Sequence, residues 1–501
     1  MFDRKRVVII GSGLGGLSCG TILQKNGFDV TVVEQGTQPG GCLQCFERKG
    51  AKFETGMHFI GSALPGQTMH SLMNYLGLLD DVKLSQLDEN GYDIVSLAGQ
   101  NFSFANGREP FIETMASYFP KEKDNIRKYY DIVKLIASSS ALHSLTSSHR
   151  DDAIHAEYQL KSINNELDQI FGDEMLKNVI VGALPLYSAQ LDKTPFAQHA
   201  HIADFYNQSA FRIVGGSDHI ARSLVANIGR MGGQVITRCK VHRIVCDERQ
   251  AVGVDTDKGF INADIVVSTI HPMRTLELLA GTNILRPAFC KRINSMPQTN
   301  GGFSVYLKFK KNTVPYMNSN FYAYRGNTPW NCEQYTDEQW PKGFLYMHMC
   351  HKENPVWAES GIIISYMNYD EVAKWHGTKI GRRGDDYERF KKERAERLIN
   401  DIERHFPGFK DSVDSFYTST PLTYVDYTGT EQGSMYGIAK DISLGVAGRV
   451  PYRTRIPNLL LAGQNVNSHG MLGVLVGTII ACSELIPAQT IYGQIQQSKC
   501  R

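Results

Sequence analysis

The sequence predicts an α/β fold, in which a parallel sheet is flanked by helices and a mixed α+β part is inserted between the strands. Three separated stretches support this prediction. Residues 7–35 have the pattern of a strand, a glycine-rich turn, a helix and a second strand, and residues 211–270 that of a helix followed by several short strands. Residues 454–486 place an apolar strand before a glycine-spaced helix. The sheet is therefore expected to be assembled from discontinuous chain.

The first stretch is a βαβ unit. Residues 6–10 (RVVII) form its first apolar strand, a helix follows the glycines, and the second strand (DVTVV) ends just before Glu34. In the motif GSGLGG, Gly11 permits the tight turn, Gly13 lets the backbone approach a pyrophosphate, and Gly16 lets the helix pack closely on the strand. The phosphates are expected at the helix N-terminus, where free N–H groups and the helix dipole favour negative charge.

Glu34 narrows the choice of nucleotide. Its carboxylate is placed to accept hydrogen bonds from a ribose diol and would repel the 2′-phosphate of NADP. NAD and FAD both stay open at this point. A second glycine pair, Gly40 and Gly41, precedes the segment GAKFETGMHFIG. A second close approach of the backbone suits an extended dinucleotide whose flavin lies deep in the protein, although a plain turn and hairpin has the same pattern.

The two later stretches complete the predicted nucleotide site. In residues 211–270, alternating apolar residues fit strands that extend the first sheet. Val241 there is placed either to meet an adenine through its backbone or to lie in an ordinary β-meander. Near the C-terminus, Gly463 and Gln464 follow an apolar strand and precede the helix that starts at Gly470. Its free N–H groups are expected to face an electron-rich flavin carbonyl.

Composition excludes several classes of function. A formal net charge of +2 leaves no basic footprint for nucleic acid. The 10 cysteines are scattered, which indicates a reducing compartment, and the CxxC of Cys42 and Cys45 lacks the second pair of a metal site. Glycines interrupt the apolar run near the N-terminus, so it is not a secretory signal, and residues 471–482 are shorter than the ~20 residues of a membrane span. We expect a cytoplasmic protein, either free or peripheral on the inner membrane surface.

These motifs together resemble the FAD-dependent phytoene desaturase, carotenoid isomerase and retinol saturase family, and the retinol saturase branch most closely. The segments that carry the resemblance are GSGLGG, VVEQ, PGGCLQCF, FETGMHFIG, GGQVITRCKV, PLTYVDYT, GSMYG and IPNLLLAGQNVNSHGMLG. The resemblance implies a discontinuous, Rossmann-like FAD-binding domain of the glutathione-reductase-2 type, from residues 1–75, 206–275 and 426–490. Residues 76–205 and 276–425 would then form the mixed α+β substrate domain.

The resemblance also implies which residues bind FAD, with NADH or NADPH as a candidate external electron donor. They are Gly11, Gly13, Gly16, Glu34, Gln35, Gly41, Val241, Gly463 and Gln464, with Met471 and Leu472 near the flavin ring. Many members have an arginine where Cys42 stands and an acid near Asn465, so some phosphate and ribityl contacts must be remade. The membrane-targeting N-terminal extension of the retinol enzyme is not found here, which suggests a bacterial relative with a different substrate.

The implied activity is saturation or desaturation of carbon–carbon double bonds in an apolar polyene or isoprenoid, by hydride transfer at flavin N5. His58, Tyr424 and Tyr436 are candidate proton donors, because they lie in the motif segments nearest the flavin; buried histidines and tyrosines also commonly have structural roles. Two alternatives remain. One is a redox-neutral carotenoid cis-trans isomerase that needs reduced FAD, and the other is a non-catalytic isoprenoid escort, which the intact glycines disfavour. The oligomeric state stays open.

Two helices and several strands of the substrate part also have predicted roles. The helix that begins at Pro120 places Ile126, Tyr129 and Val133 on one face and its basic residues largely elsewhere. It is suited either to lie on an anionic membrane or to cover the domain core. Residues 385–406 predict a second helix with a solvated, charged face. The strands GGFSVYLKFK, FLYMHMC and IIISYMNY are expected to form a sheet over the flavin, with side chains suited to an apolar tunnel or a plain core.

Overall fold

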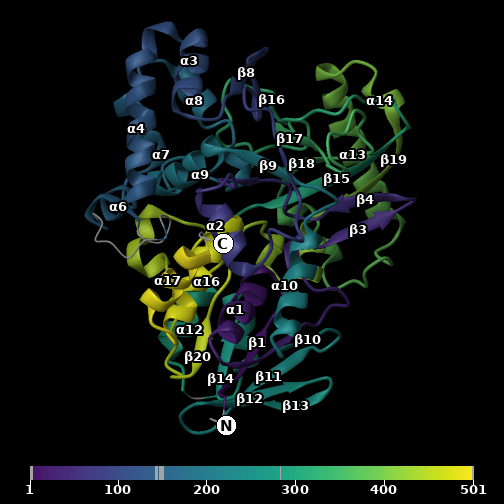
Figure 1. Cartoon of the computed structure of the whole chain (residues 1–501). Helices are drawn as coiled ribbons and strands as arrows, with labels where there is room; N and C mark the ends of the chain where they lie inside the picture. Colours follow the sequence, from purple (N-terminus) through teal and green to yellow (C-terminus); the bar gives the residue numbers. More distant parts are fainter. Residues whose placement is uncertain (1–3, 141–144, 146–151, 283, 499–501) are drawn as a thin grey trace.

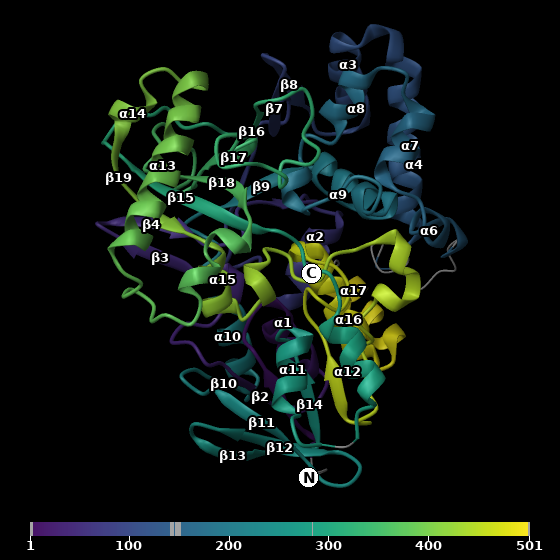
Figure 2. The same cartoon turned by 180° about the vertical axis from the view of Figure 1, so that it is seen from behind.

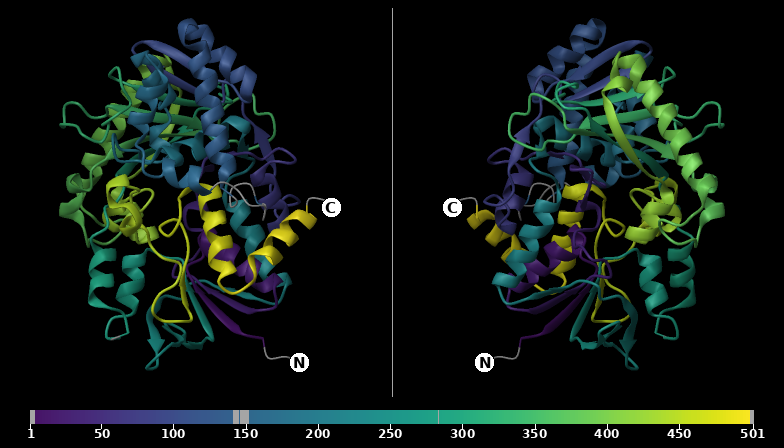
Figure 3. Two further views of the ribbon diagram at one scale, coloured as in Figure 1. Left: turned by 90° about the vertical axis from the view of Figure 1, so that its left-hand side faces the viewer. Right: turned by 90° about the vertical axis from the view of Figure 1, so that its right-hand side faces the viewer.

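The computed structural model describes residues 4–140, 145, 152–282 and 284–498 (Figure 1). The strands fall into a parallel sheet in the lower half of Figure 1 and a larger sheet in the upper half, with small sheets beside and between them. The C-terminal helices, in yellow, lie at the level where the two halves meet (Figure 3). The predicted α/β fold is confirmed.

The lower half is built on a five-stranded sheet whose strands all run parallel. In spatial order the strands are β10 (Gln234–Ile236), β2 (Asp29–Val33), β1 (Arg6–Ile10), β14 (Ile265–Ser268) and β20 (Leu459–Leu461). They come from three distant parts of the chain, as expected. Valine, isoleucine and leucine dominate the strands because helices cover both faces, as is typical of parallel sheets.

The helix α1 (Leu14–Lys25) lies on one face of this sheet, between α10 (Asp218–Arg230) and α16 (Gly470–Ser483). Its side chains share one hydrophobic core with those two helices, and α2 (Thr68–Leu76) packs on α17 (Ala488–Ser498) at the edge of that core. The opposite face carries α11 (Pro272–Leu278) and α12 (Pro287–Asn294), which face the viewer in Figure 2.

The strands β11 (Val241–Cys246), β12 (Ala251–Thr256) and β13 (Gly259–Asn262) form a separate antiparallel sheet, so the expectation that they extend the first sheet is wrong for them. Short turns link them into a meander, and β13 is largely exposed, which an antiparallel sheet tolerates on one side. Only β10 and β14 of that stretch join the parallel sheet.

The upper half contains a seven-stranded mixed sheet. In spatial order its strands are β19 (Val413–Ser419), β15 (Gly301–Phe309), β18 (Ser360–Met367), β17 (Gly343–His348), β16 (Asn320–Tyr324), β7 (Asp93–Leu97) and β8 (Gln100–Phe104). The three strands predicted as a sheet are β15, β17 and β18, which are neighbours here. The domain boundaries stay a prediction, although β7 and β15–β19 all lie within the predicted substrate segments.

Each face of this sheet carries helices. One face packs on α3 (Arg108–Tyr118), α4 (Lys123–Ser139), α7 (Ile163–Ile170), α8 (Glu174–Ile180) and α9 (Phe196–Gln208). The other packs on α13 (Asp385–His405). The apolar face of α4, with Ile126, Tyr129 and Val133, is buried in the core. The helix therefore covers the core, and that face is not free to lie on a membrane.

Two small sheets connect the halves. The hairpin β3 (Cys45–Arg48) and β4 (Ala51–Glu54) projects between them, and the short sheet of β5 (Ile60–Gly61), β9 (Ala210–Ile213) and β6 (Leu84–Gln86) lies beside it. The helix α15 (Pro421–Thr428) follows β19 and faces the same region. Among the described residues, no helix combines the length and the apolar character that a membrane crossing requires.

Candidate active site

The glycine turn between β1 and α1 has two kinds of glycine. A Cβ added at Gly16 would lie 1.9 Å from the carbonyl oxygen of Gly11, so Gly16 is needed for the close contact between helix and turn. Gly11 itself has φ +95°, a conformation that favours glycine. A Cβ added at Gly13 would meet no atom within 4 Å. The backbone at Gly13 therefore faces open space, into which a ligand can approach closely.

Glu34 is held firmly at the end of β2. Its Oε2 accepts hydrogen bonds from the N–H and the O–H of Ser12, at 3.0 and 2.6 Å, and its Oε1 accepts one from the N–H of Gly36, at 2.7 Å. A carboxylate offers about four acceptor sites, so one on Oε1 is left for a ribose hydroxyl. The carboxylate is thus fixed before any ligand binds.

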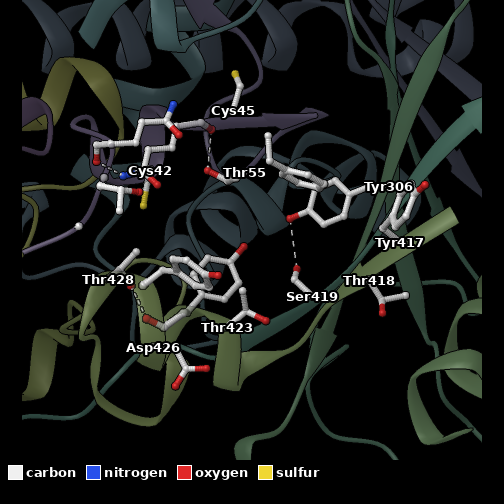
Figure 4. Close-up of a pocket in the computed structure, with 18 of the residues that line it drawn as sticks. Cys42, Cys45, Thr55, Tyr306, Tyr417, Thr418, Ser419, Thr423, Asp426 and Thr428 are labelled. Carbon is white, nitrogen blue, oxygen red and sulfur yellow. Dashed lines mark hydrogen bonds between the residues drawn. The ribbon is translucent and has the colours of Figure 1, made fainter. Parts of the chain in front are cut away.

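A large cavity of about 1190 Å³ is lined by Glu34, just after β2, and by residues of β3, β15, β19 and α15. Figure 4 shows part of this lining. Its first part is lined by Glu34, Gln35 and Gly41, three of the residues predicted to bind FAD. Gly41 has φ +55°, and an added Cβ would lie 3.1 Å from the Cα of Gly13, so the second glycine pair packs directly on the first turn. The two predicted close approaches are therefore adjacent.

The far wall of the cavity is aromatic. Tyr306 of β15 and Tyr424 of α15 both line it, and Figure 4 shows Tyr306 paired with Ser419 of β19, whose hydroxyl oxygen lies 3.2 Å away. Burial raises the pKa of both phenols above the ordinary value, so both stay protonated at neutral pH. Tyr306 was not singled out from the sequence, where the aromatic residues of GGFSVYLKF predicted only a tunnel or a core.

The two thiols of the CxxC also line the cavity, and both are free. Burial raises the pKa of Cys42 to about 11 and that of Cys45 to about 12; for Cys45, Glu54 and Asp218 add to the effect. The thiols are therefore uncharged and poorly nucleophilic at neutral pH. Among the described residues, no three histidine, cysteine or acidic side chains are grouped to hold a metal ion.

His58 lies apart from this cavity. It lines a much smaller pocket, and Tyr306 borders both, so this tyrosine stands between His58 and the large cavity. The Nδ1 of His58 is 3.8 Å from Oε2 of Glu54, whose Oε1 accepts a hydrogen bond from the N–H of Ser217. The geometry favours a structural role for His58 over direct contact with a ligand in the large cavity.

The other residues predicted to bind FAD are not part of the cavity lining. A Cβ added at Gly15 would lie 3.0 Å from the Cα of Gly463, so the C-terminal turn that contains Gly463 and Gln464 contacts the start of α1. Met471 is buried in the core beside α1, and Leu472 packs against that core. Val241 is buried under the parallel sheet, two residues after Cys239, whose N–H donates to the Glu34 carbonyl.

Tyr436 is engaged in hydrogen bonding and stacking. Its hydroxyl donates to the carbonyl of Pro185 at 2.8 Å, and its ring lies 4.5 Å from that of His469, the residue before α16. The Oδ1 of Asn465 accepts a hydrogen bond from the N–H of Ile438, at 2.9 Å. These contacts join the segment after α15 to the start of α16.

Comparison with known proteins gives the family. The sequence model of the protein family described as flavin containing amine oxidoreductase matches residues 14–485. The human all-trans-retinol 13,14-reductase is 28% identical over 100% of this chain and 88% of its own. An Oncidium prolycopene isomerase is 23% identical over 95% and 83%, and a Flavobacterium 1-hydroxycarotenoid 3,4-desaturase is 23% identical over 96% and 99%.

Solved structures agree on the fold. A Methanosarcina mazei oxidoreductase superimposes with a TM-score of 0.65 at 16% identity, over 95% of this chain and 100% of its own. Putrescine oxidase superimposes with a TM-score of 0.62 at 15% identity, over 100% of both chains.

The predicted resemblance to FAD-dependent desaturases, isomerases and retinol reductases is confirmed. Because the family match covers nearly the whole sequence, the chain belongs to the flavin-containing amine oxidoreductases, a family of FAD-dependent oxidoreductases.

Proposed function

We propose that this protein is an FAD-dependent oxidoreductase that saturates or desaturates carbon–carbon double bonds of an apolar polyene or isoprenoid. One observation carries the proposal: a single cavity begins at the fixed carboxylate of Glu34 and ends at an aromatic wall formed by Tyr306 and Tyr424. A dinucleotide held at the first end would place its flavin toward the second. The names of the relatives, a retinol reductase, an isomerase and a desaturase, support a polyene substrate.

The residues at the first end fit the dinucleotide. The open space at Gly13 leaves room for a pyrophosphate at the N-terminus of α1, and the free acceptor site on Glu34 suits a ribose hydroxyl. Gly41 keeps the backbone close beside Gly13. When bound, a reduced flavin supplies a hydride to one carbon of a conjugated double bond, or the oxidised flavin accepts one.

The side chains at the far wall bind and shield the substrate. Phe46, Tyr306, Tyr417 and Tyr424 line the cavity, and such ring surfaces suit a conjugated chain through apolar contact. Because the phenols of Tyr306 and Tyr424 stay protonated, they bring no negative charge to the apolar substrate. Tyr424 can donate a hydrogen bond, but its raised pKa makes it a weak proton source.

Absorption spectroscopy of the purified protein tests the cofactor. We expect flavin bands, and bleaching of those bands by NADH or NADPH would identify the electron donor. A colourless protein that takes up no added FAD would contradict the proposal. The product mass after incubation with a polyene then identifies the reaction, because saturation adds two hydrogens and desaturation removes two.

A redox-neutral cis-trans isomerase is the second candidate, and the similarity to the prolycopene isomerases favours it specifically. It predicts a product of unchanged mass that forms only when the flavin is reduced. A flavin-free isoprenoid escort has no physical need for the open Gly13 or for the hydrogen-bonded Glu34, so we do not favour it.

A further inference from the structure

A second cavity, of about 50 Å³, lies inside the upper half of the protein. Its wall comes mainly from β7, α4 and α9, with single residues of β8, α3 and α8. We call this cavity the α4–α9 pocket. None of its lining residues lines the large cavity, so the site described above does not account for it.

Most of the wall of the α4–α9 pocket is aromatic or aliphatic. Rings come from Tyr92, Phe111 and Tyr206, among others, and aliphatic surface comes from Val133 and Ile202. A wall of this kind with a few well-placed polar groups is typical of small-molecule binding sites. The polar groups therefore decide which molecule fits.

Two buried side chains of the wall have spare acceptor atoms. Asp93 is only 4% exposed, and among the described residues Asn320 alone hydrogen-bonds its carboxyl group, from Nδ2 to Oδ1 at 2.7 Å. Oδ2 of Asp93 is left for another donor. Asn207 is 7% exposed; its Nδ2 donates to the carbonyl of Ala105, but its Oδ1 has no partner among the described residues. Buried acceptors without partners are uncommon, so the two indicate a missing donor.

The wall also offers a hydroxyl donor. Tyr129 and Tyr187 both line the pocket and hydrogen-bond the two ring nitrogens of His199, at 2.8 and 2.9 Å. Burial lowers the pKa of His199 to about 4, so the imidazole is neutral and has one N–H donor and one acceptor. One tyrosine therefore donates to His199. The other accepts from it and keeps its own O–H proton for a different acceptor.

Water alone is a poor match for this wall. A buried water needs roughly 10–15 Å³, so a cavity of about 50 Å³ has room for about three to five waters. Each buried water typically makes about three hydrogen bonds, and the ring and aliphatic surfaces offer none. A molecule with one polar group and an apolar remainder fits the wall better.

The charges around the pocket favour a neutral molecule. Burial raises the pKa of Asp93 to about 7, and Asn320 and the guanidinium of Arg212 partly offset this effect. The other acidic side chain of the wall, Asp204, pairs with Lys134, whose Nζ lies 2.9 Å from its Oδ1. Both acids thus have cationic neighbours, and a further cation would be a buried charge without a counter-ion. A carboxylate would face both acids.

We propose that the α4–α9 pocket binds a small neutral alcohol of about five non-hydrogen atoms, whose hydroxyl group hydrogen-bonds Oδ2 of Asp93 and a tyrosine hydroxyl of the wall. A hydroxyl group suits both states of Asp93, because it donates to the ionised carboxylate and accepts from the protonated form. The proposal depends neither on FAD nor on the proposed reaction, since the two cavities share no lining residue.

Isobutanol, which has the expected size, is the probe. Saturation-transfer NMR of the purified full chain measures its Kd, which we expect in roughly the millimolar range because so small a ligand makes few contacts. Isobutylammonium has the same shape and a positive charge, and it should bind at least about tenfold more weakly. Binding of the ammonium as tight as that of the alcohol, or tighter, would overturn the assignment of a neutral ligand.

Ala203→Leu tests the location of the site. Ala203 lines the pocket on α9, and the larger leucine side chain takes up most of the space, so isobutanol binding should no longer be detected. Ala226→Leu, at an exposed alanine of α10, is the matched control and should bind as wild type does. Unchanged binding in Ala203→Leu would place the alcohol elsewhere and refute the proposal.

Asp93→Asn tests recognition without changing the size of the pocket. The hydrogen bond from Asn320 holds the remaining oxygen at the position of Oδ1, so an NH₂ group replaces Oδ2. The alcohol then loses a charged acceptor, and at about pH 8 its Kd should rise about tenfold. An unchanged Kd would exclude Asp93 as the partner of the hydroxyl group.

A crystal of the wild-type protein soaked in isobutanol gives a readout that does not depend on any variant. We expect the alcohol in the pocket, with its oxygen within hydrogen-bonding distance of Oδ2 of Asp93. Separate waters alone in the soaked pocket would refute the proposal. If Ala203→Leu does not fold, this structure and Asp93→Asn decide.

Discussion

Substitution of two neighbouring glycines by alanine should separate FAD binding from folding. Gly16→Ala brings a methyl group to 1.9 Å from the Gly11 carbonyl oxygen, and the helix must move away by about 1.5 Å to restore ordinary contact. Backbone shifts of this kind cost typically 1–3 kcal/mol and occasionally more. We therefore expect Gly16→Ala to lower the free energy of unfolding by about 3 kcal/mol even without FAD.

Gly13→Ala should have the opposite profile. Nothing in the protein lies within 4 Å of the added methyl group, and Gly13 has φ −65° and ψ 178°, which alanine adopts without strain. Stability of the FAD-free protein should change by less than about 1 kcal/mol. The methyl group occupies the space that the pyrophosphate needs, however, and a steric cost of about 3 kcal/mol corresponds to a Kd for FAD about 100-fold higher.

Urea unfolding of the FAD-free protein and a fluorescence titration with FAD measure the two effects. Gly229→Ala is the matched control, because Gly229 is an exposed glycine of α10 with no atom within 4 Å of an added Cβ. It should leave FAD affinity unchanged. If Gly13→Ala binds FAD as tightly as wild type, the turn does not hold the pyrophosphate and our assignment of the site is wrong.

Three further predictions concern charge and pH. Glu34→Gln should weaken FAD binding about tenfold in the same titration. A glutamine has only one side-chain oxygen, so its NH₂ group must face either the N–H groups of Ser12 and Gly36 or the ribose hydroxyl. Unchanged affinity would exclude Glu34 as the ribose ligand. Burial raises the pKa of Asp93 to about 7, so the folded protein holds an extra proton between about pH 4 and pH 7 and loses stability as the pH rises through that range. In urea unfolding, Asp93→Asn should be more stable than wild type by up to ~4 kcal/mol at pH 8 and equal to it near pH 4. A stability difference that stays constant across pH would contradict this. Burial lowers the pKa of His199 to about 4, so the unfolded chain gains a proton before the folded protein does as the pH falls below 6.5. The free energy of unfolding should therefore decline by up to ~1.4 kcal/mol per pH unit. His199→Gln should lessen that decline in the same assay, and an unchanged slope between pH 6.5 and pH 5 would show that His199 does not contribute.

The parts of the fold that the sequence predicts well depend on local signals. Strand β1, helix α1 and strand β2 form within the predicted residues, because apolar runs, glycines and the acidic residue all lie within one short segment. The helix α13 was likewise predicted, since its charges and apolar residues repeat at helical spacing. The sheet partners of β11–β13 were not, because pairing depends on which strand occupies the free edge, and β10 already covers β2.

The candidate site was only partly predictable for the same reason. Glu34 and the glycines lie in a recognisable motif, whereas Tyr306 reaches the cavity through the register of β15 against β19, which no local pattern encodes. His58 was a candidate because it lies within a motif segment expected near the flavin, yet Tyr306 stands between it and the large cavity.

The uncharged side chain of Cys42 makes the glycine turn important for the predicted binding of a pyrophosphate. Burial keeps the Cys42 thiol neutral, so it brings no positive charge to a bound pyrophosphate. The cationic side chains that line the cavity include Arg48 and Lys240, but both are exposed, and solvent and salt screen exposed charges. The N-terminus of α1, with its free N–H groups and partial positive charge, is then the main attraction for the phosphates. A small distortion at Gly13 should therefore lower the affinity for FAD strongly, because few other groups of this chain attract the phosphates.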